Sequence, residues 1–337
     1  MTQQGFSKLR GKFNHRPFEL MLRGLVSEQY SGRHTLETWH GLYLFAVDGS
    51  YLQLPNTADV RERLGTRGRG KQCACAGASV LFDVLNGWAL NPILTHSDMN
   101  ERVECGEHID FIGENLSHIA KNSLLLLDRG YPSGPLLESL EKAELYYLIR
   151  CSSNFHSPVN KAGLGSTAVK LAGGQSIRVY KFVLPNGDVE TLLTNLFDTP
   201  DPELALLYGK RWGIETLYTK LKNIVCVENF SGRTPNTVLQ DFWASMVLLN
   251  SVAVFQKEAD ELVTTNNQGK KLKHKYRART SDMVVTLRDR FVFCLPLRGQ
   301  GPRRQGDGGC DQDTGFFHFS CPPRSLLPPS SRFQAEV

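Results

Sequence analysis

Residues 123–131 read SLLLLDRGY. Four consecutive leucines without polar alternation predict a short strand that is covered on both faces, as in a parallel pairing. Asp128 follows directly, at the carboxyl end of the strand, where the ligands of open α/β sheets gather. A single Asp after a strand is more often a turn-former, so this residue alone is weak evidence for a site. The segment therefore predicts a strand in an α/β sheet, with an acidic group at its rim.

The segments around this strand predict an α/β fold. Asn86-Gly87 is the strongest short signal for a β-hairpin, and an apolar run at 41–47 ends at Asp48-Gly49-Ser50. The expected elements are strands at 41–47, 78–85, 88–94, 123–127 and 145–150, and helices at about 98–120 and 133–143. The order β-β-β-α-β-α-β thus joins an antiparallel meander to strands suited to parallel pairing.

Residues 208–222, YGKRWGIETLYTKLK, predict a helix with two distinct faces. At about 100° per residue, one arc of roughly 60° carries a phenol, two cations and a carboxylate: Tyr208, Arg211, Glu215 and Lys222. The far side carries the apolar stripe of a helix packed on a core: Leu206, Leu207, Ile214, Leu217, Leu221, Ile224 and Val225. A solvated charged face is the alternative. Gly209 and Gly213 each weaken the helix by about 1 kcal/mol relative to Ala, so packing must compensate or the glycines permit a close approach.

Three carboxylates in this pattern predict a metal site. Asp48 and Asp128 each follow an apolar strand, and Glu215 lies on the helix that one sheet could bring beside them. Hard oxygen ligands select magnesium or manganese over zinc. Three carboxylates around two ions about 4 Å apart can activate a water or hydroxyl and stabilise a leaving phosphate oxygen.

Composition places the chain among water-soluble intracellular proteins. It has 337 residues, 41% of them apolar, a net charge of +5 and eight cysteines without a C-x-x-C pair, which we interpret as reduced thiols. Neither a signal peptide nor an apolar run of membrane-spanning length is recognised. Two basic clusters, 61–71 and 270–279, are candidate phosphate-binding strips, and a flexible solvated linker is the alternative for the second.

The chain resembles DDE transposases of bacterial insertion sequences, in the subgroup marked by a Tyr-x2-Arg-x3-Glu-x6-Lys signature. The matching segments are VDGSYLQLPNT, LLLLDRGYPSG and YGKRWGIETLYTKLKN, within roughly residues 40–265. The resemblance implies a ribonuclease-H-like mixed sheet flanked by helices, with a β-rich insertion between the second Asp and the Glu helix. It also implies two Mg²⁺ ions, replaceable by Mn²⁺, held by the catalytic residues Asp48, Asp128 and Glu215.

The resemblance further implies a reaction and its partners. Metal-dependent cleavage at the transposon ends would be followed by strand transfer into target DNA. Tyr208, Arg211 and Lys222 would bind the DNA, although packing in the core is an alternative for Tyr208. The partners would be double-stranded DNA, as terminal inverted repeats and target, and a second copy in a synapsed homodimer, without a membrane. The expected location is the bacterial cytoplasm, in association with the nucleoid.

The ends of the chain depart from this family pattern. Only 47 residues precede Asp48, and residues 299–337 are rich in Gly and Pro without an apolar period, as in disordered or out-of-frame sequence. The expected regions are 1–40, an abbreviated DNA-binding segment; 41–150, the first part of the catalytic domain; 151–200, the β-rich insertion; 201–265, the catalytic Glu helix and the next helix; 266–298, a basic linker; and 299–337, the tail. Two alternatives stay open: an inactive remnant that only binds DNA or a partner protein, and a plain nuclease of the same fold.

Overall fold

The leucine run forms strand β5 (Ser123–Leu127) in the computed structural model, and all five of its residues are buried. It pairs in parallel with β1 (Tyr43–Gln53) on one side and with β6 (Tyr146–Arg150) on the other. Because both faces of such a strand are buried, apolar side chains are favoured at every position and polar residues do not alternate with them. The predicted parallel pairing is therefore confirmed.

The structure describes residues 3–70, 72–152, 155–171, 173–268, 276–294 and 333–335. The chain divides into two compact units, Met1–Asn250 and Ser251–Val337. Most of the basic cluster 270–279, and the tail 299–337 apart from residues 333–335, lie outside the described residues.

The antiparallel meander lies on the other side of β1. Strand β3 (Cys73–Asp83) pairs antiparallel with β1, and β4 (Trp88–Thr95) pairs antiparallel with β3. Gly87 has φ +76° in the turn that joins β3 and β4, a conformation that favours glycine. Asp83 braces the same turn, because its Oδ1 accepts hydrogen bonds from the amides of Leu85 and Asn86 at 3.0 and 2.9 Å. The predicted hairpin is confirmed.

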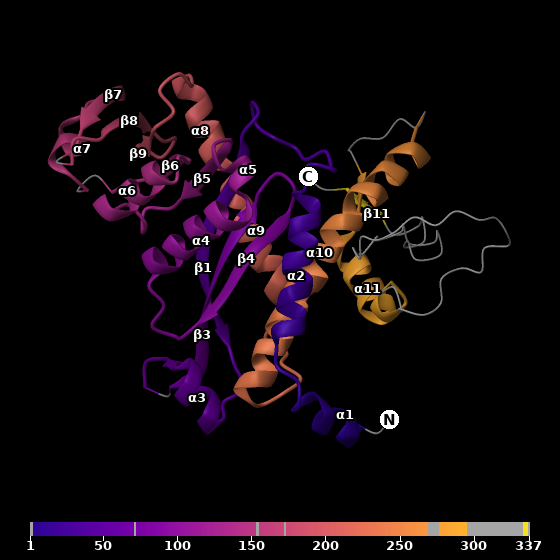
Figure 1. Cartoon of the computed structure of the whole chain (residues 1–337). Coiled ribbons are helices and arrows are strands. Elements are labelled where there is room, and N and C mark those ends of the chain that lie inside the picture. Colours follow the sequence, from indigo (N-terminus) through magenta and orange to yellow (C-terminus); the bar gives the residue numbers. More distant parts are fainter. Residues whose placement is uncertain are drawn as a thin grey trace, which may run out of the picture. The chain divides into compact units, whose positions relative to one another are not determined.

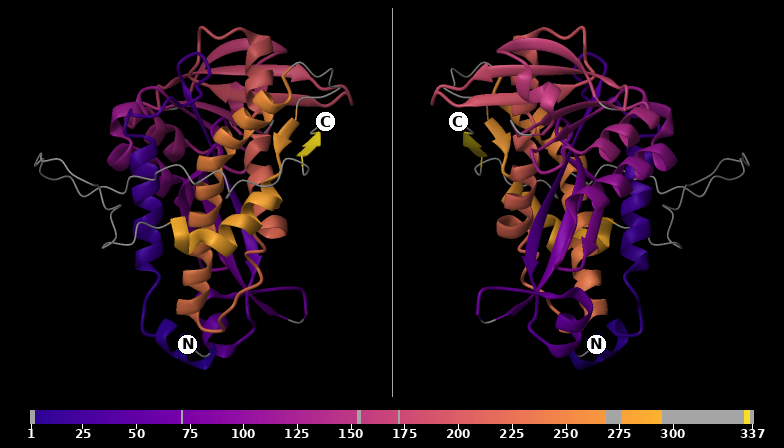
Figure 2. Two further views of the ribbon diagram at one scale, coloured as in Figure 1. Left: turned by 90° about the vertical axis from the view of Figure 1, so that its right-hand side faces the viewer. Right: turned by 90° about the vertical axis from the view of Figure 1, so that its left-hand side faces the viewer.

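The β-rich segment after β6 continues the same sheet. Strands β7 (Gly165–Lys170), β8 (Ser176–Val183) and β9 (Val189–Thr194) pair antiparallel in sequence, and β9 pairs with β6. Among the described residues the order is β2-β3-β1-β5-β6-β9-β8-β7, with β4 beside β3 and the short β2 (Thr66–Arg67) at its start. Figure 2 shows β7–β9 in pink; in the sheet, β5 and β6 separate them from the violet strands of the meander. The result is a mixed sheet.

Helices flank this sheet (Figure 1). Helix α4 (Glu101–Asn115) begins after its cap Asn100, whose side chain accepts a hydrogen bond from the Arg102 amide, and it ends before α5 (Ser117–Ala120). It is thus shorter than the single helix expected over 98–120. The other helices of this part are α1 (Gln3–Arg10), α2 (Arg16–Gln29), α3 (Ala58–Leu64), α6 (Gly134–Lys142) and α7 (Ser157–Lys161).

The helix expected over 208–222 is divided into three parts, so the prediction of one continuous α-helix is wrong. It consists of α8 (Asp201–Gly209), α9 (Trp212–Thr219) and a π-helical turn, η1 (Lys220–Ile224). At the first break, the amides of Lys210 and Arg211 bond to carbonyls three residues earlier, as in a 3₁₀ turn. Leu206 is also misplaced in the predicted apolar stripe, because 74% of it is exposed.

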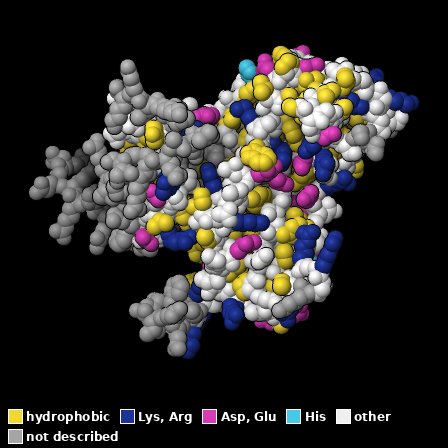
Figure 3. All heavy atoms as spheres, turned by 180° about the vertical axis from the view of Figure 1, so that it is seen from behind, with side chains coloured by type: hydrophobic (Ala, Val, Ile, Leu, Met, Phe, Trp, Pro, Cys, Tyr) yellow, Lys and Arg dark blue, Asp and Glu magenta, His cyan; other side chains and the backbone are white. Residues whose placement is uncertain are grey.

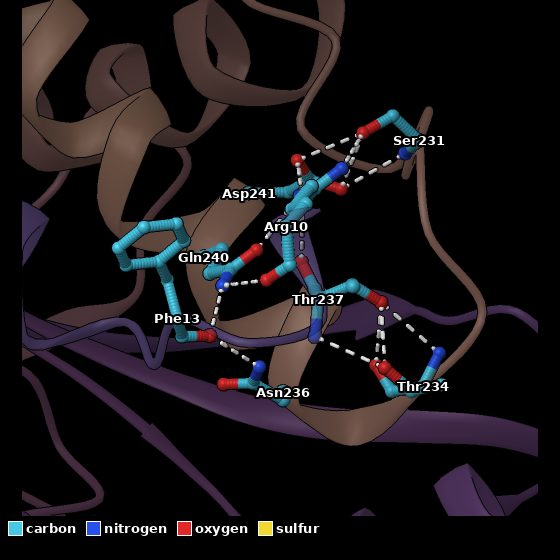
Figure 4. A network of polar contacts seen from close by, with 8 residues as sticks. All are labelled: Arg10, Phe13, Ser231, Thr234, Asn236, Thr237, Gln240 and Asp241. Atoms are coloured by element: carbon cyan, nitrogen blue, oxygen red, sulfur yellow. Dashed lines mark hydrogen bonds and ion pairs between the residues drawn. The ribbon is translucent and has the colours of Figure 1, made fainter. Parts of the chain in front are cut away.

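The long helix α10 (Pro235–Asn266) begins in the first unit, where the N-terminal segment is bonded to it (Figure 4). Arg10 donates to Gln240 Oε1 and to Asp241 Oδ1, each at 2.7 Å, and also bonds to Ser231. The Asn250 side chain accepts from the Ala89 amide at 2.9 Å and donates to the Ala89 carbonyl at 2.8 Å. These contacts fix α1 and the strand β4 to the first half of α10.

The second unit contains the remainder of α10, β10 (Tyr276–Ala278), α11 (Thr280–Cys294) and β11 (Phe333–Ala335). Strands β10 and β11 pair antiparallel, and the Ala278 amide donates to Asp260 Oδ1 at 2.8 Å. By length and composition, α10 could cross a membrane, which the sequence prediction overlooked; 61% of its apolar window is buried. A buried core helix has the same composition, so this property is weak evidence for a membrane span.

Candidate active site

The register of the two parallel strands brings Asp48 and Asp128 to the same level of the sheet. Ala46 pairs with Leu126, so two further residues on each strand lead to the two aspartates. Strand β5 ends at Leu127, whereas β1 continues to Gln53 and keeps its pairing with β3, where Asp48 lies opposite Val80. The expectation that Asp48 ends its strand is therefore wrong. Its side chain lies where the neighbouring strand stops.

Helix α9 is fixed against β1 by Tyr218. This buried phenol donates to the Asp48 carbonyl at 2.8 Å and lies 3.0 Å from the Ala78 carbonyl. One turn earlier on α9, Glu215 receives a 2.6 Å hydrogen bond from Arg211 Nη2, while Arg211 Nη1 lies 3.4 Å from Asp48 Oδ2. Arg211 thus holds the helix-borne carboxylate and the strand-borne carboxylate together.

Asp128 has its own set of partners. Its Oδ1 accepts from the Arg129 amide at 2.7 Å and lies 3.3 Å from the Tyr208 hydroxyl. Arg150, which is bonded to Glu190, approaches the same oxygen at 4.0 Å. Tyr208 lies on α8, on the other side of the helix break from Glu215, and its ring lies 5.9 Å from the Arg211 guanidinium. The Tyr208 hydroxyl therefore faces the carboxylate cluster, although most of its ring is packed.

Lys222 lies in the π-helical turn and contacts β1 beyond Asp48. Its Nζ donates to Ser50 Oγ at 2.8 Å and to the Tyr51 carbonyl at 2.9 Å. The structure thus brings all six predicted site residues to the part of the sheet around Asp48, the three acidic ones and Tyr208, Arg211 and Lys222. Arg211 differs from the simple helical face, since its guanidinium is buried against carboxylates and only 9% of the residue is exposed.

Burial and neighbouring charges shift the proton affinities of these groups. Burial raises the pKa of Asp48 to about 6; the Gly49 amide and Arg211 oppose this rise, and the charges of Glu101 and Asp128 add to it. Burial and the nearby Asp128 raise the pKa of the Tyr208 hydroxyl. Burial alone would lower the pKa of Arg211, but the surrounding negative groups raise it. The site thus contains more acidic than basic side chains near Arg211, and these side chains are partly removed from water.

Glu101 is an acidic neighbour that sequence reasoning missed. It is the first residue of α4, and its carboxylate lies beside the glycines that follow the two aspartates. A Cβ placed on Gly49 would lie 3.4 Å from Glu101 Oε1, and one placed on Gly130 would lie 3.1 Å from Oε2. An acidic residue in the first turn of a helix is common for dipole reasons alone, so the sequence contains no separate signal for this one.

The donor set suits a hard cation. Carboxylate oxygens from a strand, a strand end and a helix are the ligands that Mg²⁺ or Mn²⁺ prefers. In the part of the chain that the structure describes, however, no three His, Cys, Asp or Glu side chains converge tightly enough to hold one ion. The Arg211 ion pairs account for this spacing, because the guanidinium contacts both Asp48 and Glu215. The residues fit a divalent ion by the chemistry of their oxygen donors, and Asp48 and Glu215 would have to exchange the Arg211 guanidinium for it.

A cavity of about 360 Å³ lies next to the carboxylates. Its lining is Tyr51, Met99, Asn100, Glu101, Arg102 and Gly130. At Tyr51, the Arg67 guanidinium stacks on the ring at 3.4 Å, so the basic cluster 61–71 lies close to this strand. On the face shown in Figure 3, acidic side chains gather near the middle with Lys and Arg side chains around them.

The sequence is similar to those of two curated Escherichia coli proteins. The Escherichia coli (strain K12) protein "Transposase InsG for insertion sequence element IS4" is 24% identical over 242 residues, which are 64% of this chain and 52% of the relative. "Putative transposase InsZ" of the same strain is 24% identical over 172 residues, 50% of this chain and 55% of that protein. The chain thus spans about half the length of these curated relatives.

Two further similarities were found, one to a curated protein and one to a solved structure. "Putative transposase y4zB" of Sinorhizobium fredii (strain NBRC 101917 / NGR234) is 25% identical over 158 residues, 40% of this chain and 43% of that protein. A solved structure, "Cryo-EM structure of piggyBac transposase synaptic complex with hairpin DNA (SNHP)", matches 82% of this chain and 61% of its own, with a TM-score of 0.44 and 14% identity. The model of the family "Transposase DDE domain" matches residues 39–251, more than half of the chain, and the protein therefore belongs to that family.

Proposed function

We propose that the protein is a DNA transposase that cleaves DNA at the ends of an insertion sequence and joins the freed ends to target DNA. One observation carries this proposal: Asp48 and Glu215 both pair with Arg211, and Asp128 lies level with Asp48 on the neighbouring strand, inside the matched transposase domain. The pattern Tyr-x2-Arg-x3-Glu-x6-Lys supports the subgroup with that signature. An antiparallel meander followed by two parallel strands supports a ribonuclease-H-like core.

The proposed catalytic residues are the three carboxylates Asp48, Asp128 and Glu215. DDE transposase domains generally use divalent metal ions, and we assign two Mg²⁺ ions, replaceable by Mn²⁺, to these side chains. When bound, such ions activate the attacking water or 3′-hydroxyl and stabilise the leaving phosphate oxygen. Tyr218 holds β1 and α9 in register, so that the carboxylates of the strand and the helix face the same space.

Three further side chains would bind the DNA. Arg211 and Lys222 supply charge-assisted hydrogen bonds for phosphates, and Tyr208 supplies a hydroxyl beside Asp128. Both cations are bonded within the protein, Arg211 to carboxylates and Lys222 to β1, so DNA and metal ions would replace these internal partners. The proposed partners are terminal inverted repeats, target DNA and a second copy in the synaptic complex, in the cytoplasm at the nucleoid.

The proposed regions follow the same assignment. Residues 41–150 and 201–265 would form the catalytic domain, and 151–200, which contains β7–β9, would be the insertion between Asp128 and Glu215. Residues 1–40 would be a short DNA-binding segment, and 266–298 would be a basic linker to the tail.

The test is a cleavage and joining assay with the purified chain. The substrate is duplex DNA that carries the inverted repeats flanking the gene, with Mg²⁺ or Mn²⁺ and a target plasmid. We expect nicked ends and joined products, and we expect Asp48→Asn, Asp128→Asn and Glu215→Gln each to abolish both. Full activity in any of these variants would contradict the assignment. Hydrolysis without joining would indicate a nuclease, and DNA binding without cleavage would indicate an inactive remnant.

A further inference from the structure

Glu101 is a partly buried carboxylate to which the described contacts of the fold assign no role. Its side chain has no hydrogen bond or ion pair to any residue that the structure describes. It does not cap its helix, because the Asn100 side chain already accepts from the Arg102 amide at 3.2 Å. A carboxylate that served only the helix dipole would gain most by pointing into water. This one instead lies beside Gly49 of strand β1 and Gly130 of the loop after β5.

The place of this carboxylate is defined by two glycines. Gly49 follows Asp48 and Gly130 is two residues after Asp128, and a Cβ on either would lie within 3.4 Å of a Glu101 oxygen. At Gly130 the absence of a side chain leaves room for the carboxylate. At Gly49 a Cβ would first meet Met99 Cε, at 2.6 Å, so there Glu101 lies only at ordinary contact distance. One oxygen thus faces the segment that carries the first aspartate, and the other faces the segment that carries the second.

The position of Glu101 is also fixed from its own helix. Arg102 Nε donates to the Gly130 carbonyl at 3.1 Å, which ties the start of α4 to the loop after β5. The cavity of about 360 Å³ lies at this junction and is lined by both Glu101 and Gly130. A negative group held beside two other carboxylates, without a cation of its own, is compensated when a divalent ion binds there.

We propose that Glu101 is a fourth carboxylate of the metal-binding site, next to Asp48 and Asp128, an inference that rests on the proposed function. It would add negative charge and an oxygen donor beside the segments that follow Asp48 and Asp128. Because Glu101 begins α4 and lines the cavity, the metal site would adjoin the cavity. The metal ions would then be bound by four carboxylates, of which the sequence motif contains three.

The test is Mn²⁺ binding by the whole chain, measured by calorimetry and by the rise in thermal midpoint on adding Mn²⁺, without DNA. We expect Glu101→Gln to weaken Mn²⁺ binding about 10- to 100-fold. In the absence of metal, the same variant should melt at the wild-type temperature or above it, because one of several neighbouring negative charges has been removed. A merely structural role for Glu101 would lower the metal-free midpoint instead.

Matched variants make the outcome specific. Glu107→Gln removes an exposed carboxylate from the same helix and should leave Mn²⁺ binding unchanged. Gly130→Ala should weaken it, because the new Cβ would press on Glu101 Oε2. Wild-type affinity in both Glu101→Gln and Gly130→Ala, with binding lost in Asp48→Asn, would overturn this proposal and leave the proposed function intact. Absence of Mn²⁺ binding in the wild-type chain would overturn both.

Discussion

Arg211 lies between Asp48 and Glu215 and balances two carboxylates from different elements. Its environment explains why a guanidinium, rather than an ammonium, suits this position. Its planar fork reaches Asp48 with one Nη and Glu215 with the other, and it retains its charge when buried. A lysine has a single charged atom and could not span both carboxylates with the same geometry. In the metal-free protein, Arg211 therefore serves as the counter-ion of the site.

Removal of this counter-ion should reveal its competition with metal ions. We expect Arg211→Ala to lower metal-free stability by about 1–2 kcal/mol, because two partly exposed carboxylates lose their partner. Added Mn²⁺ should then raise the thermal midpoint of the variant more than that of the wild type. The comparison is thermal unfolding with and without Mn²⁺, with the exposed Arg129→Ala as control. An equal Mn²⁺ shift in both proteins would show that Arg211 does not compete.

His108 should make stability depend on pH. It is fully buried between Ser79 and Asn91, with ring nitrogens 2.9 Å from Ser79 Oγ and 3.1 Å from Asn91 Nδ2, and burial lowers its pKa from 6.5 to about 3. As the pH falls from 6.5 towards 3, the His108 imidazole is therefore protonated in the unfolded chain but stays neutral in the folded chain. This contribution to stability is fully present above pH 6.5 and declines by about 1.4 kcal/mol per pH unit below it.

The variant His108→Gln isolates this effect, since other groups with raised pKa, such as Asp48, change stability in the opposite direction. We expect the wild type to be the more stable protein at pH 7 and its advantage to shrink at pH 6 and pH 5. Urea unfolding at the three pH values measures the difference. If the difference in unfolding free energy between wild type and variant is the same at all three pH values, burial does not lower the pKa of His108.

At the scale of single elements, the broken helix α8–α9–η1 sets the spacing of the site. The two glycines in it play different parts. A Cβ on Gly213 would lie 3.2 Å from Val84 Cβ, so the absence of a side chain permits α9 to approach the residue that follows β3. Nothing lies within 4 Å of a Cβ built on Gly209. The close approach anticipated from the sequence applies to one glycine and not to the other.

Alanine substitutions should separate the two glycines. Gly209→Ala should stabilise the protein by about 0.5–1 kcal/mol, because it restores helix propensity without a collision. Gly213→Ala gains the same propensity but must displace Val84, so we expect no net gain or a loss of stability and a lower rate of DNA cleavage. Chemical denaturation and the cleavage assay measure the two effects. Equal stabilisation by both substitutions would contradict the claim that α9 packs closely at Gly213.

Local signals account for most of the predicted elements. The apolar run at Leu124–Leu127 and the Asn86-Gly87 turn determine their own backbone, and the strands predicted beside them appear close to where expected. The strands predicted at 41–47 and 78–85 are instead longer, Tyr43–Gln53 and Cys73–Asp83. Asp48 was placed at a strand end because Asp-Gly-Ser reads as a turn, whereas the pairing of β1 with β3 overrides that local preference. The helical wheel grouped Tyr208, Arg211, Glu215 and Lys222 but could not show what lies against that face. Glu101 depends on tertiary packing alone, and no spacing predicts it.

At the scale of the whole molecule, charge is local rather than global. The net charge is only +5, yet residues 61–71 hold five cations, and one of them, Arg67, stacks on Tyr51 of the strand that carries Asp48. We expect the double variant Arg63→Ala and Arg69→Ala, both exposed residues, to weaken DNA binding at all sequences alike. The slope of log K against log salt should fall by about 2, as for two lost phosphate contacts.

The control for this prediction is a second pair of exposed cations far along the chain, Lys121→Ala and Lys142→Ala. These should leave both affinity and salt slope unchanged. Fluorescence anisotropy with labelled duplex DNA over a series of salt concentrations gives both quantities. An unchanged slope for the 61–71 variant would exclude this cluster from the DNA path.

The side-chain amide of Asn250 affects how the protein behaves at high protein concentration. Strand β4 pairs with β3 on one side, and on its other side the Ala89 amide and carbonyl are both bonded to the fully buried Asn250 side chain. One side chain thus imitates the backbone of an additional strand at the point where the sheet ends. A sheet closed in this way offers no template there for a strand from another molecule, so the middle of α10 also protects the protein against aggregation through this edge.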